Sequence, residues 1–175
     1  MLGESLLKDL FGSRYTIGEL MRIDQGRQDK ARGCKVSLMD TFFTIKEESL
    51  SGKVKKLFTG KDSVKVFYIT LKLAVTGDTG NPHIVFIQLE PDFSMKNWEN
   101  NKIRIYCDCA DFKYRSAYLL DKRDSIFAND GIKIALGQAI SEAPKGKRGV
   151  TLLCKHSFAA LTWLMNNYTN LMSTL

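Results

Sequence analysis

Residues 63–90 read SVKVFYITLKLAVTGDTGNPHIVFIQLE, and this stretch decides the fold. In its first half, apolar side chains occupy every second position, as in a β-strand with one buried face: Phe67, Ile69, Leu71, Leu73 and Val75. Residues 76–82 combine glycine, asparagine and proline, which favour tight turns. Residues 83–90 then supply a returning strand. The stretch therefore predicts an antiparallel β-hairpin.

Two further segments predict strands beside this hairpin. Residues 35–45, KVSLMDTFFTI, are rich in β-branched and aromatic side chains. Residues 102–109, KIRIYCDC, place Ile103, Ile105 and Cys107 on one face of an extended chain. The sequence thus predicts an antiparallel sheet of about four strands.

Helical patterns lie on both sides of the predicted strands. Residues 2–11 carry leucines at helical spacing, and Thr16, with Glu19 three residues later, has the pattern of a helix-capping box. Residues 110–124 and 153–172 have apolar side chains three and four residues apart. We therefore expect an α+β fold, with N-terminal helices, the antiparallel sheet and a C-terminal helical segment.

Two connecting segments are less regular. Residues 24–33, DQGRQDKARG, are polar and charged and predict a loop. Residues 131–140 predict either a short helix or an irregular packed segment.

The composition is that of a globular protein. The chain has 175 residues, of which 44% are apolar and 26% charged, enough for one domain with a buried core. No stretch approaches the ~18 consecutive apolar residues of a transmembrane helix. Residues 1–11 lack the basic region and apolar core of a signal peptide. We expect a single domain over residues 1–175, made in the cytoplasm, with no membrane partner.

The chain is basic. It carries 26 lysine and arginine residues against 19 aspartate and glutamate residues, a net charge of +7. The excess is spread over both halves, without a polybasic tail. A charge balance of this kind permits a polyanionic partner such as nucleic acid but does not require one.

The cysteines fall into two short motifs. A C-x-C motif spans residues 107–109 at the end of a predicted strand, and a C-x-H motif spans residues 154–156 at the start of the last predicted helix. In a chain without an export signal, clustered cysteines indicate a metal site more than disulfides. The alternative is that they are buried free thiols. Cys34 stands apart and is interpreted as a free thiol.

The two motifs together supply four metal ligands, namely Cys107, Cys109, Cys154 and His156. Thiolate-rich coordination favours zinc or an iron–sulfur cluster over magnesium or calcium, and the histidine favours zinc. Four protein ligands leave no coordination position for water, so the site is predicted to be structural, with one zinc ion per chain. Asp108 and Asp111 are candidate hydrogen-bond acceptors for His156 or nearby amides, and the alternative is that they are ordinary solvated charges.

CDCADFKYRSAY at residues 107–118 and LCKHSFAAL at residues 153–161 resemble the SWIM zinc-finger pattern, in which C-x-C lies on a β-hairpin and C-x-H begins a helix. The form is most similar to versions in tailed-bacteriophage proteins, where a loop rich in lysine and proline precedes Leu-Cys-Lys-His, as in APKGKRGVTLLCKH at residues 143–156. The resemblance covers residues 103–165 and implies the same four ligands. The insertion between the motifs is longer than in a typical SWIM finger.

This resemblance implies a structural or assembly protein of a tailed-bacteriophage virion, such as a ring, adaptor or head–tail connector component in the capsid–neck region. Its partners would be other virion proteins, in a symmetric ring or in multiple copies. The alternative is a SWIM-type nucleic-acid-binding protein, whose candidate contacts are Lys145, Lys147 and Arg148. A third hypothesis is a cytoplasmic regulator made during infection.

Catalytic patterns are missing from the sequence. G-x-S-x-G, H-E-x-x-H and the phosphate-binding loop do not occur. His83 follows Pro82 in the predicted turn and is interpreted as a surface or strand-edge residue. We therefore expect a protein that is not an enzyme and takes no small-molecule substrate.

Overall fold

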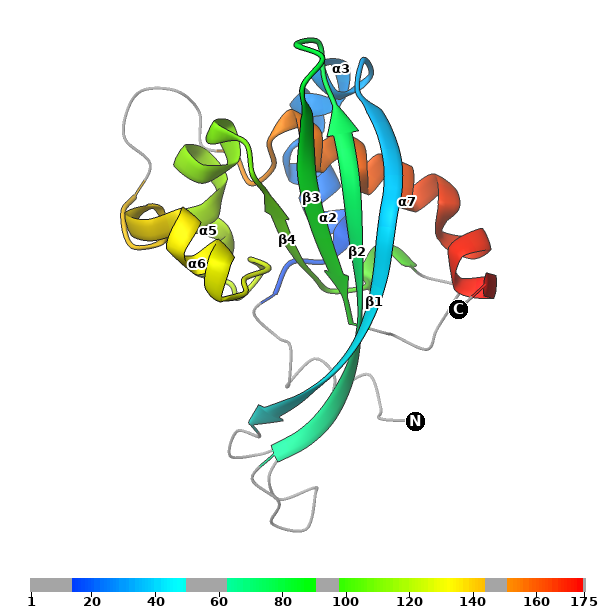
Figure 1. The fold of residues 1–175 in the computed structure, drawn as a ribbon, viewed down its shortest axis with the longest axis vertical. Coiled ribbons are helices and arrows are strands. Elements are labelled where there is room, and N and C mark those ends of the chain that lie inside the picture. Colours follow the sequence, from blue (N-terminus) through cyan, green and yellow to red (C-terminus); the bar gives the residue numbers. More distant parts are fainter. Residues whose placement is uncertain (1–13, 50–62, 91–97, 144–150, 175) are drawn as a thin grey trace.

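The structure, a computed structural model, describes residues 14–49, 63–90, 98–143 and 151–174. An antiparallel sheet of four strands, in the order β1-β2-β3-β4, forms its centre (Figure 1). The strands are β1 (Lys35–Ser49), β2 (Ser63–Thr76), β3 (Pro82–Leu89) and β4 (Ile103–Cys107). The predicted α+β fold is confirmed.

Helical elements precede and follow the sheet. Residues 2–11, where a first helix was predicted, lie outside the described residues. The α-helices are α2 (Ile17–Ile23), α3 (Gln28–Ala31), α5 (Ala117–Asp121), α6 (Asp130–Leu136) and α7 (Lys155–Thr174). Short 3₁₀ turns cover Gln25–Arg27, Trp98–Asn100 and Gly137–Ile140, and a π-helical turn covers Phe112–Ser116. None of the described helices is long and apolar enough to cross a membrane.

The β2–β3 hairpin is confirmed in detail. Its register runs from Ile69 opposite Leu89 to Thr76 opposite Pro82. In the turn, Gly80 has a φ of +75°, a conformation that glycine adopts without steric cost. The alternating side chains from Ile69 to Val75 are in the core, and those of Leu71, Leu73 and Val75 are completely buried, whereas Phe67 is exposed because β3 does not extend beside it.

Helix α7 holds the sheet and the N-terminal helices together. It runs along one side of the sheet (Figure 1), contacts all four strands, and contributes Phe158, Leu161 and Leu164 to the hydrophobic core. Near its other end, the Tyr168 hydroxyl accepts a hydrogen bond of 2.7 Å from Asn101 Nδ2. Because α7 begins at Lys155, its position fixes where the C-x-H motif lies.

The N-terminal segment is fixed by its cap. The Thr16 side chain accepts a hydrogen bond from Glu19 N at 3.1 Å, and the Glu19 carboxylate accepts one from Thr16 N at 2.8 Å. This confirms the predicted capping box. The prediction of a loop over residues 24–33 is wrong, because a 3₁₀ turn and α3 cover most of it.

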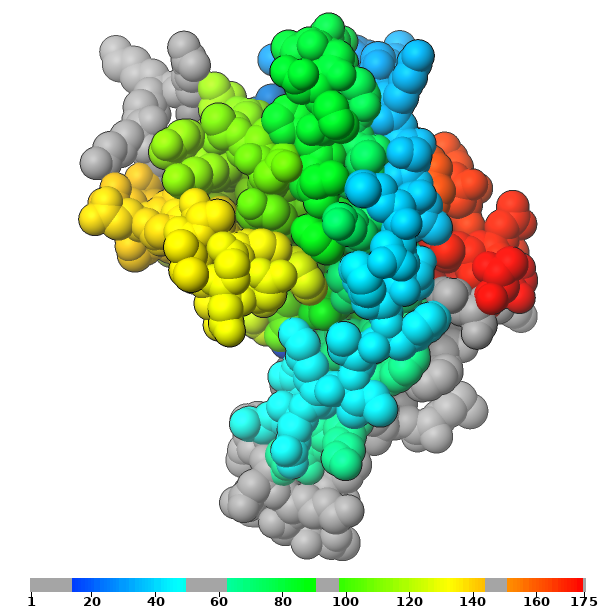
Figure 2. All heavy atoms as spheres, viewed as in Figure 1, coloured from blue at the N-terminus to red at the C-terminus, as the bar shows by residue number. Residues whose placement is uncertain are grey.

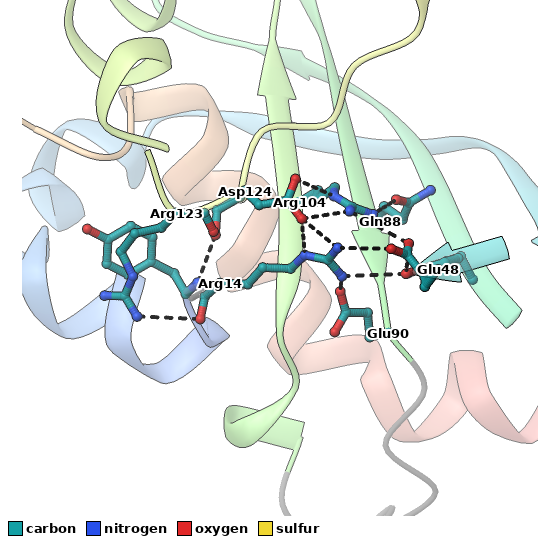
Figure 3. Close-up of polar contacts among 10 residues, drawn as sticks. Arg14, Glu48, Gln88, Glu90, Arg104, Arg123 and Asp124 are labelled. Atoms are coloured by element: carbon teal, nitrogen blue, oxygen red, sulfur yellow. Dashed lines mark hydrogen bonds and ion pairs between the residues drawn. The ribbon is translucent and has the colours of Figure 1, made fainter. Parts of the chain in front are cut away.

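A charged network closes the end of the sheet away from the β2–β3 turn (Figure 3). Arg14 is buried, and its guanidinium pairs with Glu90, with Glu48 at 3.8 Å and with Asp124 through Nε at 2.7 Å. Arg104 on β4 reaches the same Asp124 carboxylate at 2.8 Å. Each buried charge therefore has an opposite charge beside it, as a buried ion pair requires.

The network joins segments that are far apart in the sequence. Glu48 lies on β1, Glu90 follows β3, and Asp124 follows α5. Burial opposes ionisation of Asp124, but the hydrogen bond and charge of Arg104, with Arg14 adding to them, lower the pKa of Asp124. The carboxylate therefore stabilises the fold in its ionised form.

The lowered pKa predicts how stability depends on pH. An unfolded aspartate has a pKa of about 3.9, so the stabilisation from Asp124 is present above about pH 4 and is lost as the pH falls through the lower folded value. We expect Asp124→Asn to have a lower melting temperature than the parent at pH 7, and this difference to shrink between about pH 5 and pH 3. Asparagine suits the site because Asp124 has a φ of 48°.

The measurement compares the two proteins by thermal denaturation at each pH, so that acid effects common to both cancel. A difference in melting temperature that stays constant from pH 7 to pH 3, or that widens, contradicts the role given to the Asp124 carboxylate.

Candidate metal centre

The structure brings the four predicted ligands together. Cys107 is the last residue of β4, Cys109 follows two residues later, Cys154 immediately precedes α7, and His156 lies in the first turn of α7. All four side chains are buried, and one ligand atom from each lies within 4.8 Å of the others. Such a cluster could hold one metal ion. Cys34, which is half-buried, is not part of it.

The path of the chain explains why the C-x-C motif converges. Asp108 N still donates to Ile84 O at 3.2 Å, so the chain follows β3 for one residue beyond the end of β4. The chain then turns, and Lys113 N donates to Cys109 O at 3.1 Å as the π-helical segment begins. The chain therefore stays extended through Asp108, which is exposed between the buried Cys107 and Cys109, and turns at Cys109.

Backbone amides already point at two of the sulfur atoms. Phe112 N donates to Cys109 Sγ at 3.4 Å, and Ser157 N donates to Cys154 Sγ at 3.3 Å. The Ser157 hydroxyl lies 3.2 Å from the same Cys154 sulfur. Amide donors of this kind stabilise thiolate over thiol, and they orient the sulfur atoms as outer partners of a metal site do.

The hydrogen bonds between the thiols shift the pKa values of Cys107 and Cys109 in opposite directions. Hydrogen bonds from the thiols of Cys107 and Cys154 lower the pKa of Cys109 to about 4, although burial opposes this. The pKa of Cys107 is raised, first by its hydrogen bond to Cys109, then by Cys154 and by burial. In the absence of a cation, Cys109 therefore ionises more readily than Cys107. A divalent cation that replaces the thiol protons would allow all three to be thiolates.

One ring nitrogen of the His156 imidazole makes no hydrogen bond with the described residues. Its Nδ1 is buried and has no hydrogen-bond partner among the described residues. A buried nitrogen without a partner is unfavourable, and a metal ion is a partner that would satisfy it. The other nitrogen, Nε2, faces the β2–β3 turn, where a Cβ added to Gly77 would lie 3.2 Å from it. The residues present therefore fit a metal ion.

A second histidine lies against the cluster, and the sequence did not predict this contact. The ring of His83 is 4.2 Å from the ring of His156, and its side chain is only 28% exposed. His83, interpreted as a surface or strand-edge residue, is the second residue of β3 and is half-buried. It shares a face of β3 with Val85, whose partner on β4 is Cys107, so the sheet register brings it to the site.

Asp108 accepts a hydrogen bond from a nearby amide, Ile84 N, at 3.1 Å, which is one of the roles predicted for the aspartates. Asp108 Oδ1 lies 2.8 Å from Nδ1 of His83, so this carboxylate serves His83 and not His156. Asp111 pairs with Arg27 at 3.3 Å and with Arg115 at 3.0 Å. The link to Arg27 ties the turn after the C-x-C motif to the N-terminal helical region.

The candidate nucleic-acid contacts Lys145, Lys147 and Arg148 lie outside the described residues. Among the described cations near the cluster, Lys155 pairs with Asp78 in the β2–β3 turn at 3.1 Å.

No protein-family model, no curated protein and no solved structure matches this chain. The likeness to the SWIM pattern therefore rests on the residues of the two motifs.

Removing a ligand should lower metal content and stability together. We expect Cys109→Ser and His156→Ala each to lower the bound metal well below one per chain and to lower the melting temperature, because the remaining buried thiols lose their counter-charge. Cys34→Ser is the matched control and should leave both quantities unchanged. The measurements are elemental analysis of the purified protein and thermal denaturation. A metal content that stays at about one ion per chain in both ligand variants would contradict the assignment of Cys109 and His156 as ligands.

Gly77 offers a test that leaves every ligand in place. Gly77→Ala introduces a methyl group that must displace the His156 ring or the Lys155 side chain by a few tenths of an ångström. Displacing a ligand in this way should weaken metal affinity about tenfold, the lower end of the effect of altering a ligand's surroundings. Gly26→Ala is the control, because a Cβ there meets no described atom within 4 Å. Competition titration with a chromogenic chelator measures both affinities, and equal values would contradict the proposed position of His156.

Proposed function

We propose that this chain is a non-enzymatic structural or assembly protein of a tailed-bacteriophage virion, in which the cluster holds one structural zinc ion. The observation that carries the proposal is the closed ligand set: three cysteine sulfur atoms and one imidazole, all buried and mutually within 4.8 Å.

The chemistry of the donor set favours zinc. Cysteine and histidine are the usual ligands of structural zinc, whereas magnesium and calcium prefer oxygen ligands. A set of three thiolates and one imidazole is among the common structural zinc sites. Iron–sulfur clusters are usually held by four cysteines, and only three lie here.

The surroundings favour a structural over a catalytic role. Four protein ligands fill a tetrahedral zinc ion and leave no position for a reactive water molecule. Burial of all four residues also removes the site from contact with a substrate. The zinc ion would instead tie the end of β4 to the start of α7, and so close the long segment between the two motifs. A cross-link that closes a long loop stabilises mainly by restricting the unfolded chain.

The virion assignment rests on the similarity of residues 107–118 and 143–161 to tailed-bacteriophage versions of the SWIM pattern. A zinc-stapled α+β domain suits a capsid–neck component, because assembly requires a rigid body that presents surfaces to neighbouring subunits. In this proposal the protein is present in multiple copies and contacts other virion proteins.

The net charge of +7 favours the second candidate, a SWIM-type nucleic-acid-binding protein. Its contacts would be Lys145, Lys147 and Arg148, in the segment just before the C-x-H motif. The two candidates differ in how they respond to salt, since phosphate contacts weaken steeply as salt rises.

The deciding experiment is mass spectrometry of purified particles of the bacteriophage that encodes the chain, washed in high salt. A virion component remains in a fixed copy number relative to the major capsid protein. Particles that lack the chain entirely would overturn the virion proposal. A companion titration with duplex DNA at low and high salt tests the alternative, which predicts salt-sensitive binding that the triple variant Lys145→Ala, Lys147→Ala, Arg148→Ala weakens.

A further inference from the structure

The outer edge of β1 is open. β1 is the terminal strand of the sheet, and no other described strand pairs with its outer side. All of its side chains are exposed except those of Val36, Thr41 and Glu48, which are half-buried. Figures 1 and 2 show the strand running along one side of the molecule and, together with β2, extending below the helices and the other two strands. An open edge exposes a row of backbone donors and acceptors that can pair with another strand.

This edge is unusually apolar. Ile45 is 68% exposed, Met39 52% and Phe43 49%. Leu38 and Phe42 on the same strand are also exposed, and so is Phe67 on β2, whose ring stacks on that of Phe43 at 5.6 Å. Proteins usually protect an open edge with charges, proline or a covering element, and a contiguous exposed apolar surface marks an interaction site.

The end of β1 that carries Ile45 lies on a projecting two-stranded arm. β3 begins to pair with β2 at Ile69, so residues 63–68 of β2 pair only with β1 among the described strands. Their partners on β1 are residues 44–49. Two strands without a third are only marginally stable in water, so a further strand beside β1 would stabilise the arm.

We propose that β1 pairs antiparallel with β1 of a second copy of this chain, about a two-fold axis at Phe43. The charge pattern of the strand supports this register. Asp40 lies three residues before Phe43 and Lys46 three residues after it, and both are exposed. A two-fold axis at Phe43 therefore places each Asp40 opposite the partner's Lys46, which forms two opposite-charge pairs across the interface.

The same register aligns the apolar side chains. Phe43 lies opposite the partner's Phe43, and Ile45 lies opposite the partner's Thr41. Because Phe43 is opposite Ile69 in the β1–β2 pairing, these side chains share the face of the sheet that bears the core residue Ile69. With Phe67 stacked on Phe43 in each copy, four phenylalanine rings would form one row across the axis. Aromatic cross-strand pairs of this kind stabilise sheets.

Neighbouring registers are less favourable. A shift of one residue in one direction places Asp40 opposite the partner's Glu47, which sets like charges together. A shift in the other direction places Asp40 opposite Ile45 and Lys46 opposite Met39, which removes both charge pairs. Of these three registers, only the one centred on Phe43 forms both charge pairs. The result would be a continuous eight-stranded sheet through two copies, since each contributes four strands. This pairing does not depend on the proposed zinc or virion role.

Charge reversal tests the pairing in solution. Sedimentation equilibrium of the full-length, zinc-loaded protein should show a dimer of two 19.8 kDa chains. Asp40→Lys and Lys46→Asp should each weaken dimerisation about tenfold, because each places like charges opposite one another. The double variant Asp40→Lys, Lys46→Asp restores opposite charges and should restore dimerisation. A wild-type chain that remains monomeric at every concentration, or single variants that dimerise as tightly as wild type, overturns the proposal.

Cross-linking tests the register. In a Cys34→Ser background, Phe43→Cys should form a disulfide-linked dimer on mild oxidation, because opposite Cα atoms of antiparallel strands are about 4.5–5.5 Å apart. Ile45→Cys is the matched control. Ile45 is more exposed than Phe43, but Ile45 of the second copy would lie about 13 Å away along the partner strand. The Ile45→Cys variant should therefore not cross-link. Equal cross-linking at both positions, as a ring or an unspecific contact would give, overturns the two-fold register. A monomer that still binds zinc would overturn this proposal and leave the zinc site intact.

Discussion

The arrangement of the C-terminal half of the molecule depends on a cluster of three buried cysteine sulfur atoms and one imidazole, whose ligand atoms lie within 4.8 Å of one another. Three thiols in such close contact cannot all ionise, because each negative charge raises the cost of the next in a buried setting. Nδ1 of His156 is also in an unfavourable position, because it is buried without a described hydrogen-bond partner. One divalent cation resolves both conditions. The helix α7, which supplies His156, is also held against the sheet by its core residues Phe158, Leu161 and Leu164.

The two ends of the sheet are stabilised by different chemistry. At the β2–β3 turn end, the Cys107–His156 cluster joins β4 to α7. At the other end, Arg14 and Arg104 join β1, β3 and the segment after α5 through ion pairs with Glu48, Glu90 and Asp124. The apolar core lies between them. The four Cys and His residues could hold a metal ion, whereas the arginine side chains of the network are already paired with carboxylates. For this reason we assign a ligand only to the cluster.

The sequence predicted the elements that have a clear local signal. Alternation in residues 63–76 and a dense turn were enough for the hairpin, and residue type with spacing identified all four ligands. The π-helical turn at Phe112–Ser116 has no such signal, because its apolar spacing also fits an ordinary α-helix. Residues 24–33 form short helical turns although they lack apolar periodicity. Their packing against the rest of the chain, as in the Arg27–Asp111 pair, is a tertiary effect.

The surroundings of the site could not be predicted, because they depend on register. His83 reaches the cluster only because Val85 pairs with Cys107, and Gly77 faces His156 only because the turn folds over α7. The Arg14 network likewise joins residues whose sequence positions give no hint of contact. The open edge of β1 is also a consequence of strand order. Its charge pattern about Phe43 was visible in the sequence, but its meaning required knowing that β1 is an edge strand.

The central claim is that the chain holds one zinc ion through three sulfur atoms and one nitrogen. X-ray absorption at the zinc edge, on the full-length protein purified with one equivalent of zinc, tests it most directly. The account predicts three sulfur neighbours at about 2.3 Å and one nitrogen neighbour at about 2.0 Å. A shell made only of oxygen and nitrogen, or a protein that does not retain zinc through gel filtration, would contradict it.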